Sequence, residues 1–314
     1  MADIYVRPYG DRGGSPLRAV ILIVVALVLI AGIWIWLANR PPKTEEAGEA
    51  VAAPEAAAAT EVTRTVASAA PDAGLKAPGL FSQAQALANS GQPAQAQKLL
   101  AEVVSTTTDE TLKNDALRLL GRTNVELFLS DAPSPDKKSY VIQPGDSLDR
   151  IARRNKTTVA LLQKMNRIEG SLIYPGARIW LPAAPFVIHV DKSDRTLDLM
   201  INDKLFKRYP AGLGRYGKTP LGTFRTVVHQ TNPDWSPPSG GIIPFGDPRN
   251  VLGTRWISIR DKTRPDTKGF GIHGTADRDS IGGETSNGCI RMLNEDVEEV
   301  FMLIPRGTEV IISE

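Results

Sequence analysis

The sequence is poor in the residues that build disulfides and metal sites. Its 314 residues contain one cysteine, Cys289, and three histidines, which are His189, His229 and His273. A single cysteine excludes a disulfide within the chain, and the scattered histidines form no cluster with metal-ligand spacing. A net charge of +2 is too small to indicate a nucleic-acid partner. We therefore expect no metal and no other cofactor, and the presence of the one thiol needs a chemical explanation.

Charge is missing from one long segment, the strongly apolar run Ala19–Ala38. A helix of this length spans a hydrocarbon core of about 30 Å. Arginines precede the run, whereas glutamates soon follow it, so the positive-inside rule places residues 1–18 in the cytoplasm. A cleaved signal peptide is the alternative, but its apolar region is usually shorter. We expect a single-pass anchor at 19–38 in the cytoplasmic membrane, with the C-terminal domains extracytoplasmic, on the periplasmic or wall side.

Large apolar side chains are almost absent from residues 39–78, which are rich in alanine, proline, glutamate and threonine. Such a segment cannot bury enough surface to offset the entropy lost on ordering. The composition therefore predicts a flexible tether that carries the following domains away from the membrane.

Apolar residues recur at helical spacing over residues 79–131. Asn89-Ser90-Gly91-Gln92-Pro93 separates the first two expected helices, and Asp109 is placed to cap the third. The region faintly resembles a tetratricopeptide-like helical hairpin. Two interpretations stay open, namely a binding surface for a protein partner and a simple spacer.

The only cysteine lies in a polar, glycine-containing motif, Ser286-Asn287-Gly288-Cys289-Ile290-Arg291-Met292, which follows His273-Gly274-Thr275 closely. A thiol acts as a nucleophile when a partner takes its proton, and histidine is the usual partner. A buried cysteine that packs as a small hydrophobe is the alternative. The polar residues before Cys289 and the arginine after it favour a reactive thiol, with His273 as its base.

These motifs resemble the signature of the L,D-transpeptidases, which are peptidoglycan cross-linking enzymes of the YkuD fold. The resemblance covers residues 185–314 and extends to Thr219-Pro220-x-Gly222-Thr223-Phe224 and Leu252-Gly253-Thr254-Arg255. It implies a mostly-β catalytic domain, with a β-sandwich or a barrel-like pair of sheets. Alternating and turn-bounded patterns predict its strands at 187–190, 196–201, 205–211, 222–229, 256–260, 271–273 and 309–312. One helix is expected near Glu295–Ile304 with Asn294 as its cap, and the irregular stretch 229–250 is either a lid or a surface loop.

Residue types suggest further roles around the thiol. The resemblance implies that the backbone carbonyl of Gly274 orients the imidazole of His273. The N–H groups of Gly288 and Cys289, together with that of Asn287, are candidate donors to the oxyanion of a tetrahedral intermediate.

Two side chains complete the candidate site. Arg291 could hold a substrate carboxylate or brace its own loop, and the sequence does not decide between the two roles. Ser286 is expected to make local hydrogen bonds.

Residues 139–182 resemble a LysM module, a β-α-α-β unit that binds glycan strands containing N-acetylglucosamine. The resemblance rests on Tyr140-Val141-x-x-Pro144-Gly145-Asp146-Ser147-Leu148, Asn166 and Ile173-Tyr174-Pro175-Gly176. Asp146 is expected to cap the first helix, and Thr157 or Thr158 the second. Asp149 stands where the family often has tryptophan.

The resemblance implies a peptidoglycan L,D-transpeptidase, an acyltransferase with a cysteine nucleophile whose partners are stem peptides and glycan strands. A tetrapeptide stem would lose its terminal D-alanine to form a thioester, which then passes to the side-chain amine of another stem. Three alternatives stay open. The acyl group could go to a protein or a free D-amino acid, it could go to water, or the chain could be a peptidoglycan-binding scaffold without activity.

Overall fold

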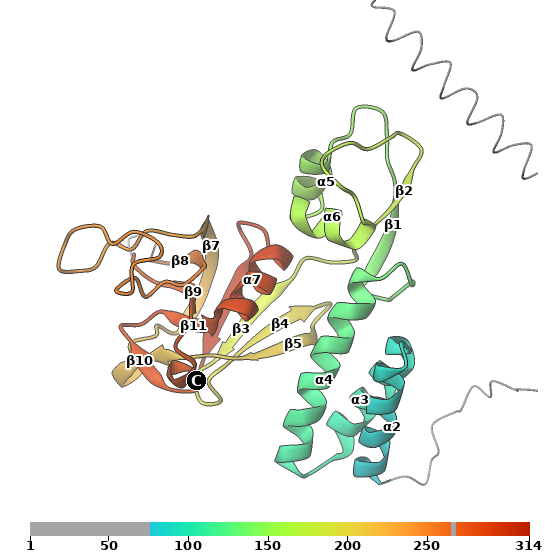
Figure 1. The fold of residues 1–314 in the computed structure, drawn as a ribbon, viewed down its shortest axis with the longest axis horizontal. Helices are drawn as coiled ribbons and strands as arrows, with labels where there is room; N and C mark the ends of the chain where they lie inside the picture. The colour runs from blue at the N-terminus through green and yellow to red at the C-terminus, as the bar shows by residue number, and fades with distance from the viewer. Residues whose placement is uncertain (1–75, 265–267) are drawn as a thin grey trace, which may run out of the picture. The chain divides into compact units, whose positions relative to one another are not determined.

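The computed structural model describes residues 76–264 and 268–314 (Figure 1). The predicted cytoplasmic segment 1–18, the predicted anchor 19–38 and residues 39–75 of the predicted tether lie outside this part of the chain. None of the helices in the described ranges is long and apolar enough to cross a bilayer.

Three consecutive helices form the region after the tether, and their bounds are α2 (Ala77–Asn89), α3 (Pro93–Thr106) and α4 (Glu110–Leu129). The carboxylate of Asp109 accepts hydrogen bonds from the N–H groups of Thr111 (2.8 Å) and Leu112 (3.2 Å), which confirms the predicted cap of α4. Because α2 begins at Ala77, the last two residues assigned to the tether are helical instead. Their proline occupies the first turn, where a missing N–H costs nothing.

The next unit has the predicted β-α-α-β order, with bounds β1 (Lys137–Val141), α5 (Leu148–Arg154), α6 (Val159–Asn166) and β2 (Arg178–Pro182). The two strands pair antiparallel, with Tyr140 opposite Ile179. Thr158 caps α6 through the N–H of Leu161, as expected. The structure shows that the expected cap of α5 is wrong by one residue, since Ser147 accepts from the N–H of Arg150.

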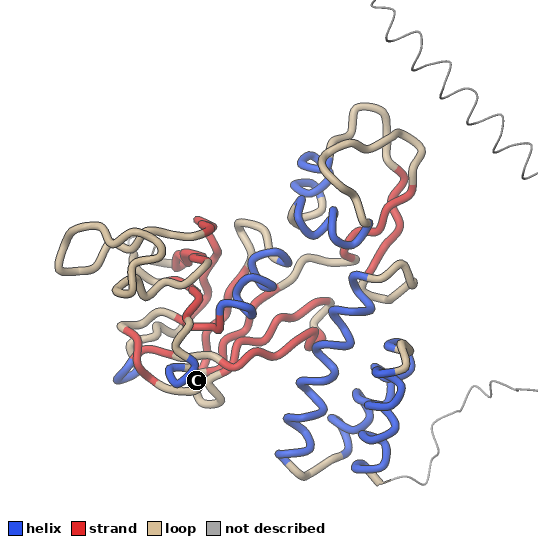
Figure 2. Tube along the Cα trace, viewed as in Figure 1, coloured by secondary structure: helices blue, strands red, loops and turns tan. Residues whose placement is uncertain are grey.

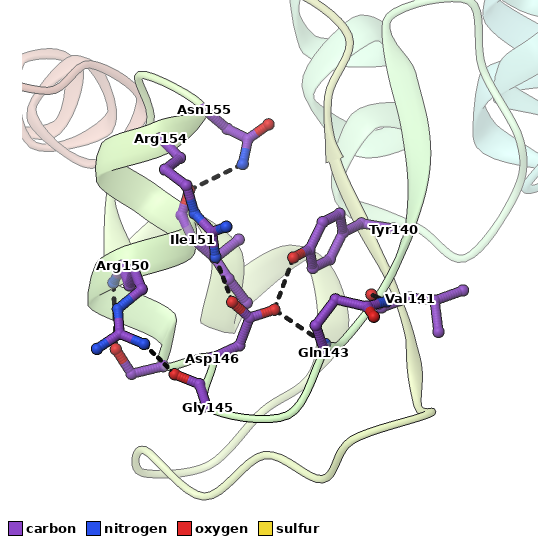
Figure 3. Close-up of polar contacts among 10 residues, drawn as sticks. Tyr140, Val141, Gln143, Gly145, Asp146, Arg150, Ile151, Arg154 and Asn155 are labelled. Carbon is purple, nitrogen blue, oxygen red and sulfur yellow. Dashed lines mark hydrogen bonds and ion pairs between the residues drawn. The ribbon is translucent and has the colours of Figure 1, made fainter.

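Asp146 has a different role from the predicted cap (Figure 3). Its carboxylate accepts from the hydroxyl of Tyr140 (2.6 Å) and the N–H of Gln143 (2.9 Å), and it pairs with Arg154. These three bonds tie the turn after β1 to helix α5, and they lower the pKa of Asp146. Charged hydrogen bonds of this kind hold the carboxylate ionised and leave the shorter serine to cap the helix.

One eight-stranded sheet forms the frame of the C-terminal domain, in the order β11-β9-β8-β7-β12-β3-β4-β5. The expected pair of sheets is thus one large sheet beside a short parallel pair, β6 with β10. All seven predicted strands are present, and three short ones were missed, namely β6, β10 and β11. The bounds are β3 (Val187–Asp191), β4 (Thr196–Ile201), β5 (Lys204–Pro210), β6 (Leu213–Gly214), β7 (Gly222–Thr231), β8 (Arg255–Asp261), β9 (Gly271–Thr275), β10 (Glu284–Ser286), β11 (Ile290–Leu293) and β12 (Glu309–Ser313).

Helix α7 (Asn294–Leu303) follows β11 directly and packs on β8, β9 and β11 (Figures 1 and 2). Its cap is Leu293 rather than the predicted Asn294. The side-chain oxygen of Asn294 instead accepts the N–H of Thr254 at 3.0 Å. This bond fastens the segment before β8 to the start of α7. The long stretch between β7 and β8 is irregular, apart from a bridge between Trp235 and Ile243.

The helical region and the β-α-α-β unit share a hydrophobic core with the sheet. Phe128 of α4 and both Leu161 and Met165 of α6 belong to the same buried cluster as the strand residues Ile188 and Leu199. Hydrogen bonds also join these two units to the catalytic domain. The side-chain amide of Asn124 donates to the carbonyl of Phe206 (2.7 Å). The hydroxyl of Thr158 donates to the carbonyl of Met302 (2.5 Å). The unit at 139–182 is therefore packed against the catalytic domain.

A buried lysine strengthens the junction between α4 and β1. The ammonium of Lys137 donates to the carbonyls of Leu127 (2.9 Å) and Ser130 (2.8 Å). These carbonyls end helix α4, where a positive charge is favoured. The ammonium also lies 5.4 Å from the ring centre of Trp180. Burial lowers the pKa of Lys137, but its two carbonyl partners stabilise the charged form.

Candidate active site

Cys289 lies at the end of a tight loop that leads from β10 into β11. The hydroxyl of Ser286 donates to the carbonyl of Cys289 (2.7 Å) and accepts the N–H of Gly288 (3.0 Å). One buried serine therefore closes the loop from both sides and fixes the backbone just before the thiol. The thiol itself donates to the carbonyl of Gly269 at 3.5 Å.

Glycine is required at two positions around this loop. Gly288 has φ +124°, and a Cβ there would lie 2.6 Å from the ring of Phe270. A Cβ on Gly214 would lie 2.6 Å from the Cα of Gly288. The loop is thus wedged between Phe270 on one side and the turn after β6 on the other, which leaves the backbone beside Cys289 little freedom to move.

The parallel pairing of β9 with β11 sets His273 beside the strand that follows the thiol. His273 lies opposite Arg291 in this pairing, and Cys289 directly precedes β11, two residues before Arg291. Residues that lie opposite each other in a sheet point to the same face, so His273 and Arg291 share one face. Sequence reasoning missed strand β11, which creates this arrangement.

The orientation of His273 is set by its own neighbour. Its Nδ1 lies 2.8 Å from the carbonyl oxygen of Gly274. A carbonyl oxygen only accepts, so Nδ1 carries the proton and Nε2 is free to act as a base. Gly274 allows this geometry because a Cβ there would lie 2.3 Å from the side-chain oxygen of Asn294.

An aromatic wall borders the histidine. Trp256 of β8 lies opposite His273, and the two ring centres are 6.0 Å apart. A Cβ on Gly271 would lie 2.5 Å from the Trp256 ring, so a glycine makes room for the indole. Sequence reasoning missed Trp256 and Phe270 as site residues. In the sequence, Phe270 stands out only because glycines flank it, and Trp256 only because it follows the Leu252-Gly253-Thr254-Arg255 motif.

Burial favours the neutral forms of both the thiol and the imidazole. Burial lowers the pKa of His273 to about 4, with a smaller contribution from the charge of Arg291, against the opposing bond to Gly274. Burial raises the pKa of the Cys289 thiol, which the N–H of Gly271 and the charge of Arg291 only partly offset. A neutral imidazole with a free Nε2 can take the thiol proton during attack rather than before it.

We expect alkylation of Cys289 by iodoacetamide to accelerate steadily with pH. The thiol pKa lies above its ordinary 9.0. The thiolate fraction, and with it the rate, should therefore rise about tenfold per pH unit from about pH 6 to about pH 8. Intact-protein mass spectrometry follows the reaction, since the chain has one cysteine. A preformed thiolate–imidazolium pair would give a rate that stays flat over this range, and that result would contradict a neutral pair.

Arg291 contacts its own loop. Its Nη1 donates to the hydroxyl of Thr285 at 2.9 Å, and its backbone exchanges two hydrogen bonds with Gly212. Arg291 therefore braces its own loop, which is one of the two roles that the sequence left open. Its buried Nε–H makes no hydrogen bond with any residue that the structure describes. Asn287, by contrast, has an exposed side chain.

The comparisons with known proteins match both folded modules. Residues 185–312 match the L,D-transpeptidase catalytic domain (YkuD), and residues 140–182 match the LysM domain. The chain is 37% identical over 182 residues to the putative L,D-transpeptidase YkuD of Bacillus licheniformis, covering 55% of this chain and 98% of that protein. Its Bacillus subtilis counterpart is 34% identical, with 56% and 98% covered.

Solved structures show a more distant likeness. L,D-transpeptidase 3 from Mycobacterium tuberculosis, in complex with a faropenem-derived adduct, is 21% identical, with a TM-score of 0.35. The match covers 44% of this chain and 65% of that one.

Proposed function

The chain belongs to the L,D-transpeptidase family, and from this premise we propose that it cross-links peptidoglycan stem peptides through a thioester on Cys289. One observation carries the proposal. Cys289 directly precedes β11, the strand that pairs in parallel with β9 and its His273; the Gly274 carbonyl holds Nδ1–H of His273, so that Nε2 is the available base. A nucleophile, a base and a group that orients the base are the parts that acyl transfer needs.

In the first step, the sulfur of Cys289 attacks the carbonyl that precedes the terminal residue of a tetrapeptide stem. Nε2 of His273 takes the thiol proton and then gives it to the leaving amine, so that a D-amino acid departs and a thioester remains. In the second step, the amine of another stem attacks the thioester. His273 takes a proton from that amine and returns it to the sulfur.

The oxyanion that forms in each step needs N–H donors. Gly288 already donates its N–H to Ser286 in this structure. We therefore assign the role first to the N–H of Cys289, with that of Asn287 as the second donor. The bond between Gly288 and Ser286 would then hold the two neighbouring amides in place.

The experiment that tests the proposed function identifies the acceptor. Purified protein is incubated with disaccharide-tetrapeptide fragments, and the products are separated by mass. A dimer together with released D-alanine is the expected outcome. Tripeptide alone would indicate a hydrolase, and incorporation of an added D-amino acid would indicate exchange. A scaffold without activity would give no product and no acyl-enzyme.

The modules support a location at the cell wall. We propose that the LysM module binds glycan strands and that residues 19–38 anchor the chain in the cytoplasmic membrane, with the other domains outside. Leu172 (67% exposed) and Tyr174 (64% exposed) offer apolar surface on the LysM module for contact with a sugar. Protease added to intact spheroplasts should then digest the folded domains, and their full protection would contradict this orientation.

A further inference from the structure

Two guanidinium groups meet beside the catalytic loop. Arg291 donates from Nη1 to the hydroxyl of Thr285 (2.9 Å), and Arg215 donates from Nε to the carbonyl of the same residue (3.1 Å). Arg215 begins the short turn after β6, far from Arg291 in the sequence. Like charges repel at this range, so their convergence on one residue needs an explanation.

No carboxylate of the described residues lies within 4.0 Å of either guanidinium, although neighbouring arginines are paired. Arg195 pairs with Glu284 (3.7 Å), and Arg278 pairs with Glu295 (2.5 Å). Asp277 attracts Arg291, but from beyond ion-pair distance. Within the described ranges, this pair of cations therefore has no anion of its own.

Arg291 also has an unused donor. Its Nε is buried and has no hydrogen-bond partner. A buried donor without a partner is unfavourable and needs an explanation, and a bound group that accepts its hydrogen bond is one such explanation. The ligand that fits two forked guanidinium groups is a carboxylate, which each of them can bind with two hydrogen bonds.

Both arginines lie close to the catalytic loop. Arg291 follows Cys289 by two residues, and its charge acts on the thiol. Gly214, which immediately precedes Arg215, lies against the loop at Gly288. The N–H of Gly214 donates to the hydroxyl of Thr219 (2.8 Å), and this bond fixes the start of the turn. The turn therefore brings Arg215 against the loop that carries Cys289 and Arg291.

We propose that Arg215 and Arg291 together bind the C-terminal carboxylate of the acyl donor, which belongs to the residue that leaves when the thioester forms. This inference rests on the proposed function. Consecutive Cα atoms are about 3.8 Å apart, so this carboxylate lies only one residue beyond the carbonyl that Cys289 attacks. Donors that end at that residue would be selected, because a longer peptide would place a neutral amide at the clamp.

The step is balanced without any further reactant. The C–N bond breaks as the C–S bond forms, and the amine leaves with the proton from His273. The released D-amino acid takes its carboxylate away from the clamp. The same two arginines would seat a free D-amino acid for the reverse reaction, with its amine directed at the thioester.

The test compares three donors by the rate of acyl-enzyme formation, measured as kcat/KM. The first is a tetrapeptide with a free C-terminal carboxylate, and the second is its C-terminal carboxamide. The third keeps the terminal carboxylate but has any side-chain carboxylate of its third residue amidated. The unmodified protein should prefer the first donor over the second by about 10- to 100-fold, as expected for charge-assisted bonds. The third donor should behave like the first.

Variants assign this preference to the clamp. In Arg215→Gln the ratio of kcat/KM between the carboxylate and carboxamide donors should fall toward one. Arg215→Lys keeps the positive charge but cannot form two parallel hydrogen bonds, so its ratio should be intermediate. Arg215 is exposed, so these variants should fold. Arg195→Gln removes the same charge near β10 and should keep the full ratio.

The outcomes separate the two proposals. Equal rates on carboxylate and carboxamide donors would overturn the clamp alone, as would an unchanged ratio in Arg215→Gln. A third donor that reacts as slowly as the second would show that the side-chain carboxylate of the stem is the group that binds, and would also overturn the proposal. No acyl-enzyme with any donor would overturn the proposed function together with the clamp.

Discussion

Replacing Cys289 with alanine is expected to reduce acyl transfer by at least about 10⁴-fold while leaving the fold intact. Cys289 is the only thiol in the chain, so no other side chain can form the thioester. The fold should persist because the hydrogen bond that the thiol donates, to the carbonyl of Gly269 at 3.5 Å, is weak. Release of D-alanine measures activity, and thermal unfolding measures stability. Turnover above about 1% of the unmodified rate would show that Cys289 is not the nucleophile.

His273→Gln provides a matched comparison. Glutamine keeps a polar side chain at this buried position but cannot act as the base. Acyl transfer should fall sharply near neutral pH and recover partly as the pH rises, because the thiolate then forms without help. Cys289→Ala should show no such recovery. Two variants with the same pH profile would contradict the division of roles between thiol and imidazole.

The sequence predicted the framework of the domain well, because its strands carry regular alternation. Thr196–Ile201 has the predicted bounds, and β12 differs by one residue at its end. The strands that were missed are short and lie among glycines and polar residues. β10 spans only Glu284–Ser286, and β11 begins directly after Cys289. Local pattern is weakest there because long-range pairing, rather than propensity, makes these residues strands.

Chemistry was easier to predict than placement. Cys289 and His273 are recognisable because few residue types can act as a nucleophile or a base. Trp256 and Arg215 could not be assigned, since a tryptophan in a strand and an arginine in a turn are ordinary residues until the fold brings Trp256 beside His273 and Arg215 beside Thr285. Two of the predicted caps were wrong for a related reason. Asp146 and Asn294 are good caps locally, yet each bonds to a residue outside its helix, Tyr140 and Thr254 respectively.

The sequence did not show that the LysM module shares a core with the catalytic domain. Residues 139–182 resemble a complete module, but α6 contributes to the buried cluster of the sheet. The sequence could not show this, because a side chain that faces another domain looks like any other apolar residue on a helix. The contact has a functional meaning under the proposed function. A glycan-binding module fixed to the catalytic domain would hold the bound strand at a set position relative to the thiol, rather than only raise its local concentration.

Phe128→Ala is expected to lower the free energy of unfolding of the catalytic domain by about 3–5 kcal/mol. Phe128 is 1% exposed, and its ring packs edge-to-face against Phe186 (centres 5.6 Å apart) and Phe206 (5.2 Å). These three rings come from α4, the segment before β3, and β5. The truncation therefore leaves a cavity at the junction of the helical region and the sheet, which the surrounding strands cannot fill by small shifts.

Denaturant unfolding measures this effect, with protection of Cys289 from alkylation as a reporter inside the catalytic domain. Leu172→Ala, at a side chain that is 67% exposed, is the control and should change stability by less than about 0.5 kcal/mol. If the helices were only a spacer, Phe128→Ala would unfold them separately and leave Cys289 as protected as before. Loss of protection together with the helices would show that α4 belongs to the fold that holds the catalytic thiol in place.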